Sequence, residues 1–447
     1  MKKLILITIL STTILSCKNF LEVKPDQKLV VPKKLTDLQA LLDENFINTI
    51  PALAEGAADN YYLSDADFNA TSNERDRNVY LWRNTADDGD AGNWQRMYNT
   101  ILSCNVVLET LAQNDYPGEE QLAAHLRGRA LFHRANNFFS LLMIFAKAYD
   151  PQTAATDLGI PLRLSSDFNQ VNRRNTVEEC FNKMITDLKE AASLLEEKGL
   201  VATRPDKASA YALLAKVCLF KQDDESAAAY AEASLEISNT LLDYNTLDRN
   251  SNIPFTRLNA ETIFYATGTY TNLAPARSKI APDLYHLYHA DDLRKQLFFR
   301  LNTDGVSYQF KGSYTGQNNT TIFTGITTAE VLLTGAEALA RLGHTEAAAE
   351  NLNILLLKRY RAGTHIPVTE TDAGLLLTRI LEERRKELVC RGIRWYDLKR
   401  LNLDPATAVT LSRQLAGQTH TLAPGSKAYV FPIPQEVIER GGLVQNE

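Results

Sequence analysis

Two segments of the chain are similar to each other, and each has the pattern of a helix, a short polar turn and a second helix. The first reads AYALLAKVCLFKQDDESAAAYAEASL and the second reads VLLTGAEALARLGHTEAAAENLNILL. Ala215 and Ala227 are twelve positions apart, and Ala336 and Ala348 have the same spacing. Small residues at this offset let antiparallel helices approach closely, as in tetratricopeptide repeats. The pattern predicts either a stack of repeats, whose usual role is binding, or two ordinary helical hairpins.

Helical periodicity covers much of the remaining chain and predicts a mainly α-helical fold. Thr176 with Glu179 forms a capping-box pattern at one helix start. Asn93 is expected to cap another helix, and Gly343 is expected to end one. The expected helices are 35–43, 94–112, 119–148, 177–197, 207–221, 225–239, 328–342, 345–360 and 372–391.

Two long segments, about 45–92 and 240–326, lack this periodicity and are rich in Asn, Asp, Gly, Thr and Tyr. We expect short strands in them, for instance at 262–266. Long irregular segments are uncommon inside compact domains and tend to be functional. No linker composition divides the chain, so we expect one domain over 17–447, with these segments on the ligand side and a helical core at about 94–240 and 327–401.

The N-terminus has the features of a secretory signal. Two lysines precede a short apolar run, Leu4–Leu15, which is too short to span a bilayer by itself. The run ends Ile-Leu-Ser-Cys, which resembles a bacterial lipobox. We therefore expect 1–16 to be a lipoprotein signal peptide and Cys17 to be lipidated, with an incidental thiol after a plain signal as the alternative. Stable attachment requires two or more acyl chains.

Charge and cysteine usage limit the functional classes. Lys and Arg number 48 against 54 Asp and Glu, a net charge of −6, which gives no electrostatic reason to bind nucleic acid. Cys104 and Cys218 lie on apolar helical stripes, so buried, unpaired thiols are expected. There is no CxxC pair, so no structural zinc site is expected. The cysteines other than Cys17 are Cys104, Cys180, Cys218 and Cys390.

Residues 380–401 read ILEERRKELVCRGIRWYDLKRL and mix charged with aromatic side chains, which must be paired if they are buried. A solvated helix face is the alternative. Here the chain resembles the SusD/RagB family, the surface nutrient-binding lipoproteins of Bacteroidetes. Arg391 stands where the family usually has Glu, and Cys390 where an aromatic residue is common, which leaves one local ion pair open. The matching residues are Glu383, Arg384, Arg385, Glu387, Leu388, Gly392, Arg394, Trp395, Asp397, Leu398 and Arg400.

The resemblance extends over nearly the whole chain, from CKNFLEVKPD through NWQRMYNTILSCNVVLE to FPIPQEVIERGGLVQNE. It implies a tetratricopeptide-like helical fold of the SusD-like α-α superhelix type. It also implies a lipid anchor at the outer membrane, facing outward. The implied partner is a SusC-like TonB-dependent transporter, to which the lipoprotein delivers captured oligosaccharide, or peptide in the RagB branch. No catalysis is implied.

Catalytic and metal-binding patterns are weak. The sequence contains no nucleophile elbow, Walker loop, dinucleotide fingerprint or HExxH motif. His286 and His289, followed by two aspartates, are expected to flank a helix end. The three aspartates in 87–90 do not have the spacing of a calcium loop and are expected to cap a helix. We therefore expect no metal site and no enzyme activity.

Sugar capture requires aromatic faces beside hydrogen-bonding groups. In NVYLWRN an extended chain places two aromatic rings and an asparagine on one side, and KGSYTGQNN holds a tyrosine among small polar residues that bury it poorly. A core position is the alternative for each ring. The predicted ligand-binding residues are Trp82, Tyr80, Asn84, Asp65, Tyr270 and Tyr314, and Tyr61, Tyr62, Asp67 and Tyr308 lie in the same segments.

Four functions remain open on this basis. Glycan capture for a transporter is favoured. The same scaffold binding peptides or another nutrient, a surface glycoside hydrolase, and a structural lid whose only ligand is the barrel are the alternatives. Turnover distinguishes the hydrolase from the other three.

Overall fold

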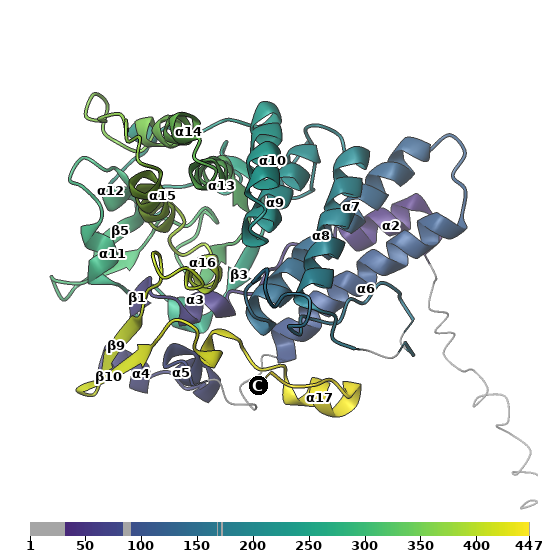
Figure 1. The fold of residues 1–447 in the computed structure, drawn as a ribbon, viewed down its shortest axis with the longest axis horizontal. Helices are drawn as coiled ribbons and strands as arrows, with labels where there is room; N and C mark the ends of the chain where they lie inside the picture. Colours follow the sequence, from purple (N-terminus) through teal and green to yellow (C-terminus); the bar gives the residue numbers. More distant parts are fainter. Residues whose placement is uncertain (1–31, 84–90, 168, 171–172, 447) are drawn as a thin grey trace, which may run out of the picture.

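The computed structural model describes residues 32–83, 91–167, 169–170 and 173–446. It is mainly helical, and its long helices pack side by side in antiparallel pairs, while short strands and helices gather at one end (Figure 1). The predicted fold class is confirmed. All nine expected helices are present, with ends that differ from the prediction by no more than four residues. They are α2 (Leu35–Leu42), α6 (Ala91–Gln113), α7 (Glu120–Phe145), α8 (Val177–Leu194), α9 (Lys207–Phe220), α10 (Asp224–Ile237), α13 (Thr328–Arg341), α14 (Thr345–Leu357) and α15 (Ala373–Glu387).

The two similar segments form neighbouring helical hairpins, α9 with α10 and α13 with α14, and α10 packs on α13. Their four equivalent alanines are completely buried between the helices. Gly335 shows how close the two hairpins lie, because a Cβ atom there would be 3.1 Å from the Cβ of Ala231 in α10. This packing is the tetratricopeptide-like arrangement that the spacing predicts.

Helix ends follow local chemistry. The capping box at the start of α8 is present, since Thr176 Oγ1 accepts from the Glu179 amide and the Glu179 carboxylate accepts from the Thr176 amide. Gly343 follows α13 with a φ of 80°, the left-handed conformation that favours glycine. The cap prediction for Asn93 is wrong, because α6 begins at Ala91 and Asn93 lies in its first turn.

The segments predicted to be irregular contain short elements. The first holds α3 to α5 and β1, and because Tyr80 ends helix α5, the extended conformation considered for NVYLWRN is wrong for the described part of that stretch. The second holds β2 to β8, α11 and α12, and β2 confirms the strand expected at 262–266. All strand pairs are antiparallel: β1 with β4, β2 with β8, β3 with β7, β5 with β6, and β9 with β10. The bounds are α3 Leu53–Ala57, α4 Asp65–Asn69, α5 Glu74–Tyr80, α11 Pro282–His286, α12 Arg294–Phe298, α16 Arg394–Leu401, α17 Gln435–Gly441, β1 Tyr61–Tyr62, β2 Thr262–Phe264, β3 Thr267–Thr269, β4 Lys279–Ile280, β5 Phe299–Leu301, β6 Tyr308–Phe310, β7 Thr321–Phe323, β8 Ile326–Thr327, β9 Leu411–Leu415 and β10 Gln418–Leu422.

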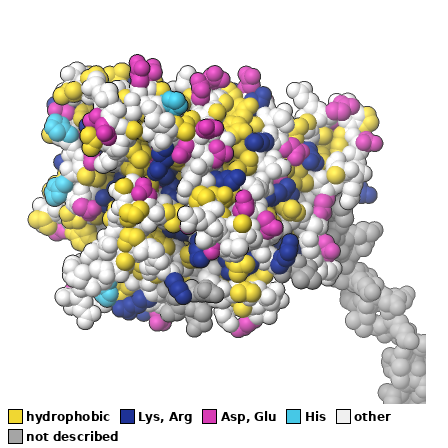
Figure 2. All heavy atoms as spheres, in the orientation of Figure 1, with side chains coloured by type: hydrophobic (Ala, Val, Ile, Leu, Met, Phe, Trp, Pro, Cys, Tyr) yellow, Lys and Arg dark blue, Asp and Glu magenta, His cyan; other side chains and the backbone are white. Residues whose placement is uncertain are grey.

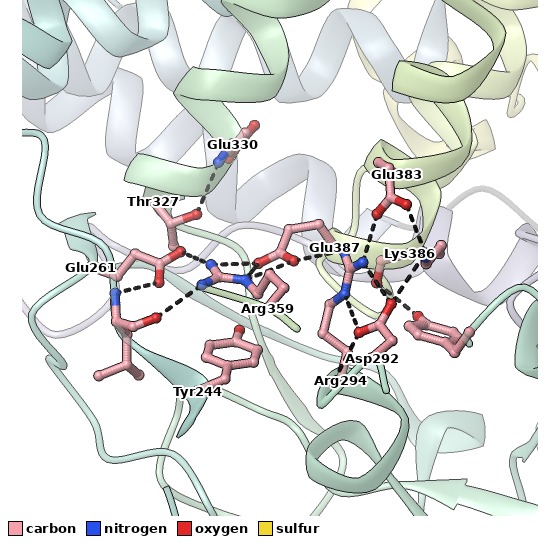
Figure 3. Close-up of polar contacts among 12 residues, drawn as sticks. Tyr244, Glu261, Asp292, Arg294, Thr327, Glu330, Arg359, Glu383, Lys386 and Glu387 are labelled. Carbon is pink, nitrogen blue, oxygen red and sulfur yellow. Dashed lines mark hydrogen bonds and ion pairs between the residues drawn. The ribbon is translucent and has the colours of Figure 1, made fainter. Parts of the chain in front are cut away.

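A buried network of ion pairs joins the second segment to the helices (Figure 3). Arg359 Nη2 lies 2.7 Å from Glu261 Oε1 beside β2 and 2.8 Å from Glu387 Oε1 of α15. Arg294 of α12 bonds the other oxygen of Glu387 at 3.1 Å. Because these groups are almost completely buried, each charge requires its partner. The remaining members are Asp292, Glu383 and Lys386.

The charged motif at 380–401 is buried rather than solvated. Arg384 Nε donates to Asp397 Oδ2 at 2.9 Å, and Arg400 Nη2 lies 2.7 Å from Glu337 Oε2 of α13. The prediction that its charges are paired is therefore confirmed for these side chains.

The surface of the molecule carries side chains of both charges. Acidic, basic and apolar side chains interleave over the face shown in Figure 2. Within the described ranges, no helix is both long enough and apolar enough to span a membrane, and no group of three or more His, Cys, Asp or Glu side chains converges as a metal site. The four cysteines after the N-terminal segment are buried and free, as predicted.

Candidate functional site

The structure buries the aromatic residues of NVYLWRN that are described. Tyr80 ends α5 with its ring completely buried, and its hydroxyl accepts from the Leu63 amide. Trp82 is 7% exposed and donates from Nε1 to Ala57 O at 2.9 Å. The Arg413 guanidinium lies 3.9 Å and 4.5 Å from the centres of these two rings. The expected exposure is therefore corrected, because rings covered in this way present no face to a sugar.

The two tyrosines predicted in the second segment are also in the core. Tyr270 is 5% exposed, and Tyr314, expected to be poorly buried, is completely buried. The Tyr314 hydroxyl lies 2.7 Å from that of Tyr244. Arg391 lies 3.7 Å above the Tyr314 ring, so the arginine that departs from the family pattern stacks on an aromatic side chain. The correction has one cause: residues distant in sequence cover both rings.

The predicted polar ligand residues are not buried with these aromatic rings where the structure describes them. Asp65 is exposed, and its Oδ1 accepts from the Ala416 amide at the β9–β10 turn. Asn84 lies outside the described residues, as does Cys17. Of the neighbouring candidates, Asp67 pairs with Lys279 at 2.5 Å. Neither Asp65 nor Asp67 lines the cavities described below.

A polar cavity of about 410 Å³ lies elsewhere on the same two segments. One wall comes from the end of α2 and the loop that follows it, and the other from β3, β7 and the loop before β2. The segments predicted to form the ligand side thus meet here, although the residues differ from those predicted. The lining residues are Leu42, Asp43, Glu44, Asn45, Ile47, Asn48, Thr203, Arg257, Tyr265, Thr267, Thr315, Gln317 and Thr321.

Backbone pairing holds the two walls together. The Ile50 amide donates to Thr267 O at 2.9 Å, and the Thr267 amide donates to Asn48 O at 3.0 Å, so this loop runs parallel beside β3. Gly268 permits the approach, because a Cβ atom there would be 2.2 Å from Ile50 O. A larger residue at this position would push the two walls of the cavity apart.

Arg257 and Tyr265 form the aromatic corner of the cavity. The exposed Arg257 guanidinium lies 4.8 Å from the centre of the Tyr265 ring. Gly316, with a φ of 68°, approaches the Arg257 backbone so closely that a Cβ atom would be 3.1 Å from its amide nitrogen. Leu258, next to the arginine, has a φ of 55°, a conformation that non-glycine residues adopt mainly where the surrounding structure requires it.

The opposite wall supplies hydrogen-bonding groups. Asn48 donates from Nδ2 to Thr203 O at 2.7 Å, while its buried Oδ1 accepts no hydrogen bond from the described residues. A buried acceptor without a protein partner calls for water or a ligand. With the threonines and Gln317, it gives the cavity the mixture of donors and acceptors that hydroxyl groups require.

Asp43, one of the two carboxylates that line the cavity, lacks the raised pKa of a general acid. Burial acts to raise the pKa of Asp43, but hydrogen bonds from Arg204 and Arg129 outweigh it and hold the pKa below its usual value. A glycosidase general acid requires a raised pKa. Glu55 has its pKa raised by burial to about 7, yet it is completely buried and bonded to Asn60 and Gly392.

Two family models match the chain. One, described as starch-binding associating with outer membrane, matches residues 19–219, and the other, described as the SusD family, matches residues 288–447. The chain belongs to the SusD/RagB family. The segment between the two matched regions includes Arg257 and Tyr265, so the candidate corner lies where neither model reaches.

Individual SusD-like relatives agree with this assignment. SusD-like protein P2 of Formosa agariphila is 24% identical, with 79% of each chain covered. A structure described as a putative sugar binding protein from Bacteroides vulgatus has a TM-score of 0.76 at 22% identity and covers 93% of this chain and 99% of its own. Surface glycan-binding protein A from Bacteroides fluxus has a TM-score of 0.71 at 19% identity, with the same coverage. At these identities the structures show the fold.

The residues of the cavity gave little signal in the sequence. Tyr265 lies in the predicted strand 262–266 and Gln317 in KGSYTGQNN, but no pattern distinguishes them from their neighbours. Arg257 is an isolated basic residue, and its stacking on Tyr265 becomes visible only in the folded chain.

Proposed function

We propose that this SusD/RagB-family chain is a surface lipoprotein of the outer membrane that captures carbohydrate and delivers it to a SusC-like TonB-dependent transporter. Binding without catalysis is proposed. The observation that carries the proposal is the polar cavity with Arg257 over Tyr265, on the two segments that lie outside the helical stack.

The chemistry of the cavity supports a sugar ligand. A pyranose presents hydroxyl groups at its edge and C–H groups on its faces. Asn48 Oδ1 and the threonine hydroxyls suit the edge, and the guanidinium on Tyr265 gives a flat, cationic surface. Pockets for small ligands usually measure about 300–1,000 Å³, so a cavity of about 410 Å³ has the size of a small-ligand site.

Relatives support the same ligand class. Two proteins of this fold are described as a putative sugar binding protein and a surface glycan-binding protein, and one family model is described as starch-binding. Peptide is the alternative ligand, because the resemblance to the RagB branch of the family implies peptide binding. The pKa of Asp43 is held low by two arginines, which argues against this carboxyl group as the general acid of a glycosidase.

Calorimetry against a panel of polysaccharides and peptides, with product analysis of the same samples, tests the proposal. We expect saturable heat with a glycan and no new products. Arg257→Ala should weaken binding at least tenfold, the loss of about 1.4 kcal/mol. Arg249→Ala is the matched control, since Arg249 is an exposed arginine of the same segment outside the cavity lining. Equal loss in both variants, or a peptide as the preferred ligand, would contradict carbohydrate capture at this cavity.

Lipid attachment at Cys17 is tested separately. Each buried CH₂ contributes about 0.8 kcal/mol, so the acyl chains of a lipoprotein hold it firmly to a membrane. Labelled fatty acid should enter the wild-type chain and be absent from Cys17→Ala. Label that persists in the variant would contradict the anchor, and failure of a barrel protein to copurify with the tagged chain would contradict the transporter partnership.

A further inference from the structure

A second and larger cavity, of about 560 Å³, lies where the end of α7 meets α16 and the C-terminal segment. This segment runs along the lower edge of the molecule in Figure 1. Asn446 donates from Nδ2 to Phe145 O at 3.0 Å and to Phe431 O at 2.8 Å, which fixes one rim of the cavity. No residue of this cavity lines the one that contains Arg257.

Lys399 places a buried ammonium group in this cavity. Its side chain is 5% exposed, and Nζ donates to Met143 O at 2.7 Å and Ala146 O at 2.5 Å, the free carbonyls at the end of α7. No carboxylate of the described residues lies within ion-pair distance of it. An ammonium carries three donors, so two carbonyls leave one proton available. Burial lowers the pKa of Lys399 to about 7, since the buried ammonium loses its hydration and has no partner anion to compensate.

Arg174 is a second buried cation on the same cavity. It is 9% exposed and donates to Gly159 O at 2.7 Å, Leu158 O at 2.9 Å and Val444 O at 3.1 Å. All three are backbone carbonyls, and within the described residues no carboxylate pairs with it. Arg359 in the ion-pair network, by contrast, has two carboxylates within 2.8 Å.

The acidic side chains of the cavity are already engaged. Asp157 bonds Lys147 Nζ at 2.6 Å and Thr153 Oγ1 at 2.6 Å. Asp150 accepts from the Gln152 amide at 2.9 Å. The lining holds four basic side chains, those of Lys147, Arg174, Lys399 and Lys427, against these two carboxylates. The cavity therefore carries an excess of positive charge in a chain whose net charge is negative. Its remaining walls combine hydrogen-bonding and apolar groups from Asn402, Leu403, Ser426, Tyr429, Val430 and Gln445.

We propose that this cavity binds an acidic sugar unit, a uronic acid, whose carboxylate faces the buried cations Lys399 and Arg174. A carboxylate supplies the missing negative charge and accepts the free ammonium proton. The hydroxyl groups of Ser426 and Tyr429 meet the ring hydroxyls, and the apolar wall meets the C–H face. The inference is independent of glycan capture at the Arg257 cavity, because the two sites share no residue.

Calorimetry with the full chain in detergent, using D-glucuronate, D-glucose and N-acetylglycine, tests the proposal. We expect saturable binding of glucuronate, with glucose and N-acetylglycine each at least tenfold weaker. Absence of glucuronate binding, or equal binding of glucose, would overturn the role of the carboxylate. Equal binding of N-acetylglycine would overturn the sugar as the ligand class.

Variants locate the site. Lys399→Met should weaken glucuronate binding at least tenfold. Lys311→Met is the matched control, because Lys311 is equally buried and its Nζ donates to two backbone carbonyls far from this cavity. Arg174→Gln is an independent variant for the case in which Lys399→Met unfolds. Unchanged affinity in Arg174→Gln and in a folded Lys399→Met would overturn the assignment.

Discussion

Replacing Arg359 by methionine removes the cation at the centre of the buried network in Figure 3. Glu261 is completely buried and Glu387 is 1% exposed, and both lie within 2.8 Å of the guanidinium. The variant leaves two carboxylates without this partner, and it also loses the hydrogen bond to Leu242 O. Breaking a buried ion pair costs about 3–5 kcal/mol, a large part of a domain stability of about 5–15 kcal/mol.

Urea unfolding followed by circular dichroism measures this loss. At pH 7.5 we expect the free energy of unfolding to fall by about 3–5 kcal/mol in Arg359→Met. The loss should be smaller at pH 5, because an unpaired buried carboxyl takes up a proton and a neutral group is cheaper to bury. Arg361→Met is the control: Arg361 is 52% exposed and lies 3.5 Å from Asp291, so its loss should stay below about 1 kcal/mol. Similar losses in both variants would refute the reasoning that burial makes this network strong.

Two further predictions concern stability. Gly268→Ala should lower the free energy of unfolding by about 1–3 kcal/mol, because the new Cβ meets Ile50 O at 2.2 Å. Gly441→Ala at the end of α17 should be neutral or stabilising, because its Cβ makes only an ordinary contact with Leu443 at 3.7 Å. Urea unfolding compares the two variants, and equal effects would contradict the close approach. Burial lowers the pKa of His133 to about 3, so its neutral form stabilises the fold and about 2 kcal/mol should be lost as the pH falls from 7 to 5. His133→Phe should reduce that pH dependence, and an unchanged slope would contradict it.

The helical part of the fold was predictable because local rules determine it. Periodicity located every long helix, the pair Thr176 and Glu179 located a helix start, and Gly343 located an end. Such signals act over a few residues and need no knowledge of the tertiary structure. The cap expected at Asn93 failed because α6 begins at Ala91, three residues before the predicted start.

The candidate site was only partly predictable. Composition located the two segments that line the polar cavity, but not the side chains in it. An alternating aromatic pattern such as that at Tyr80 and Trp82 is equally typical of a ligand platform and of a core. Here both rings belong to the core, because Arg413, which is distant in the sequence, covers them. The Arg257 and Tyr265 corner also depends on contacts between segments, including the close approach of Gly316.

Calorimetry of wild-type chain and Arg257→Ala against the same panel of polysaccharides, with product analysis, tests the central claim most directly. The account predicts saturable binding of a carbohydrate to the wild-type chain, binding at least tenfold weaker in the variant, and no new products from either. Carbohydrate binding that is unaffected by Arg257→Ala, or the appearance of cleaved sugars, would contradict it.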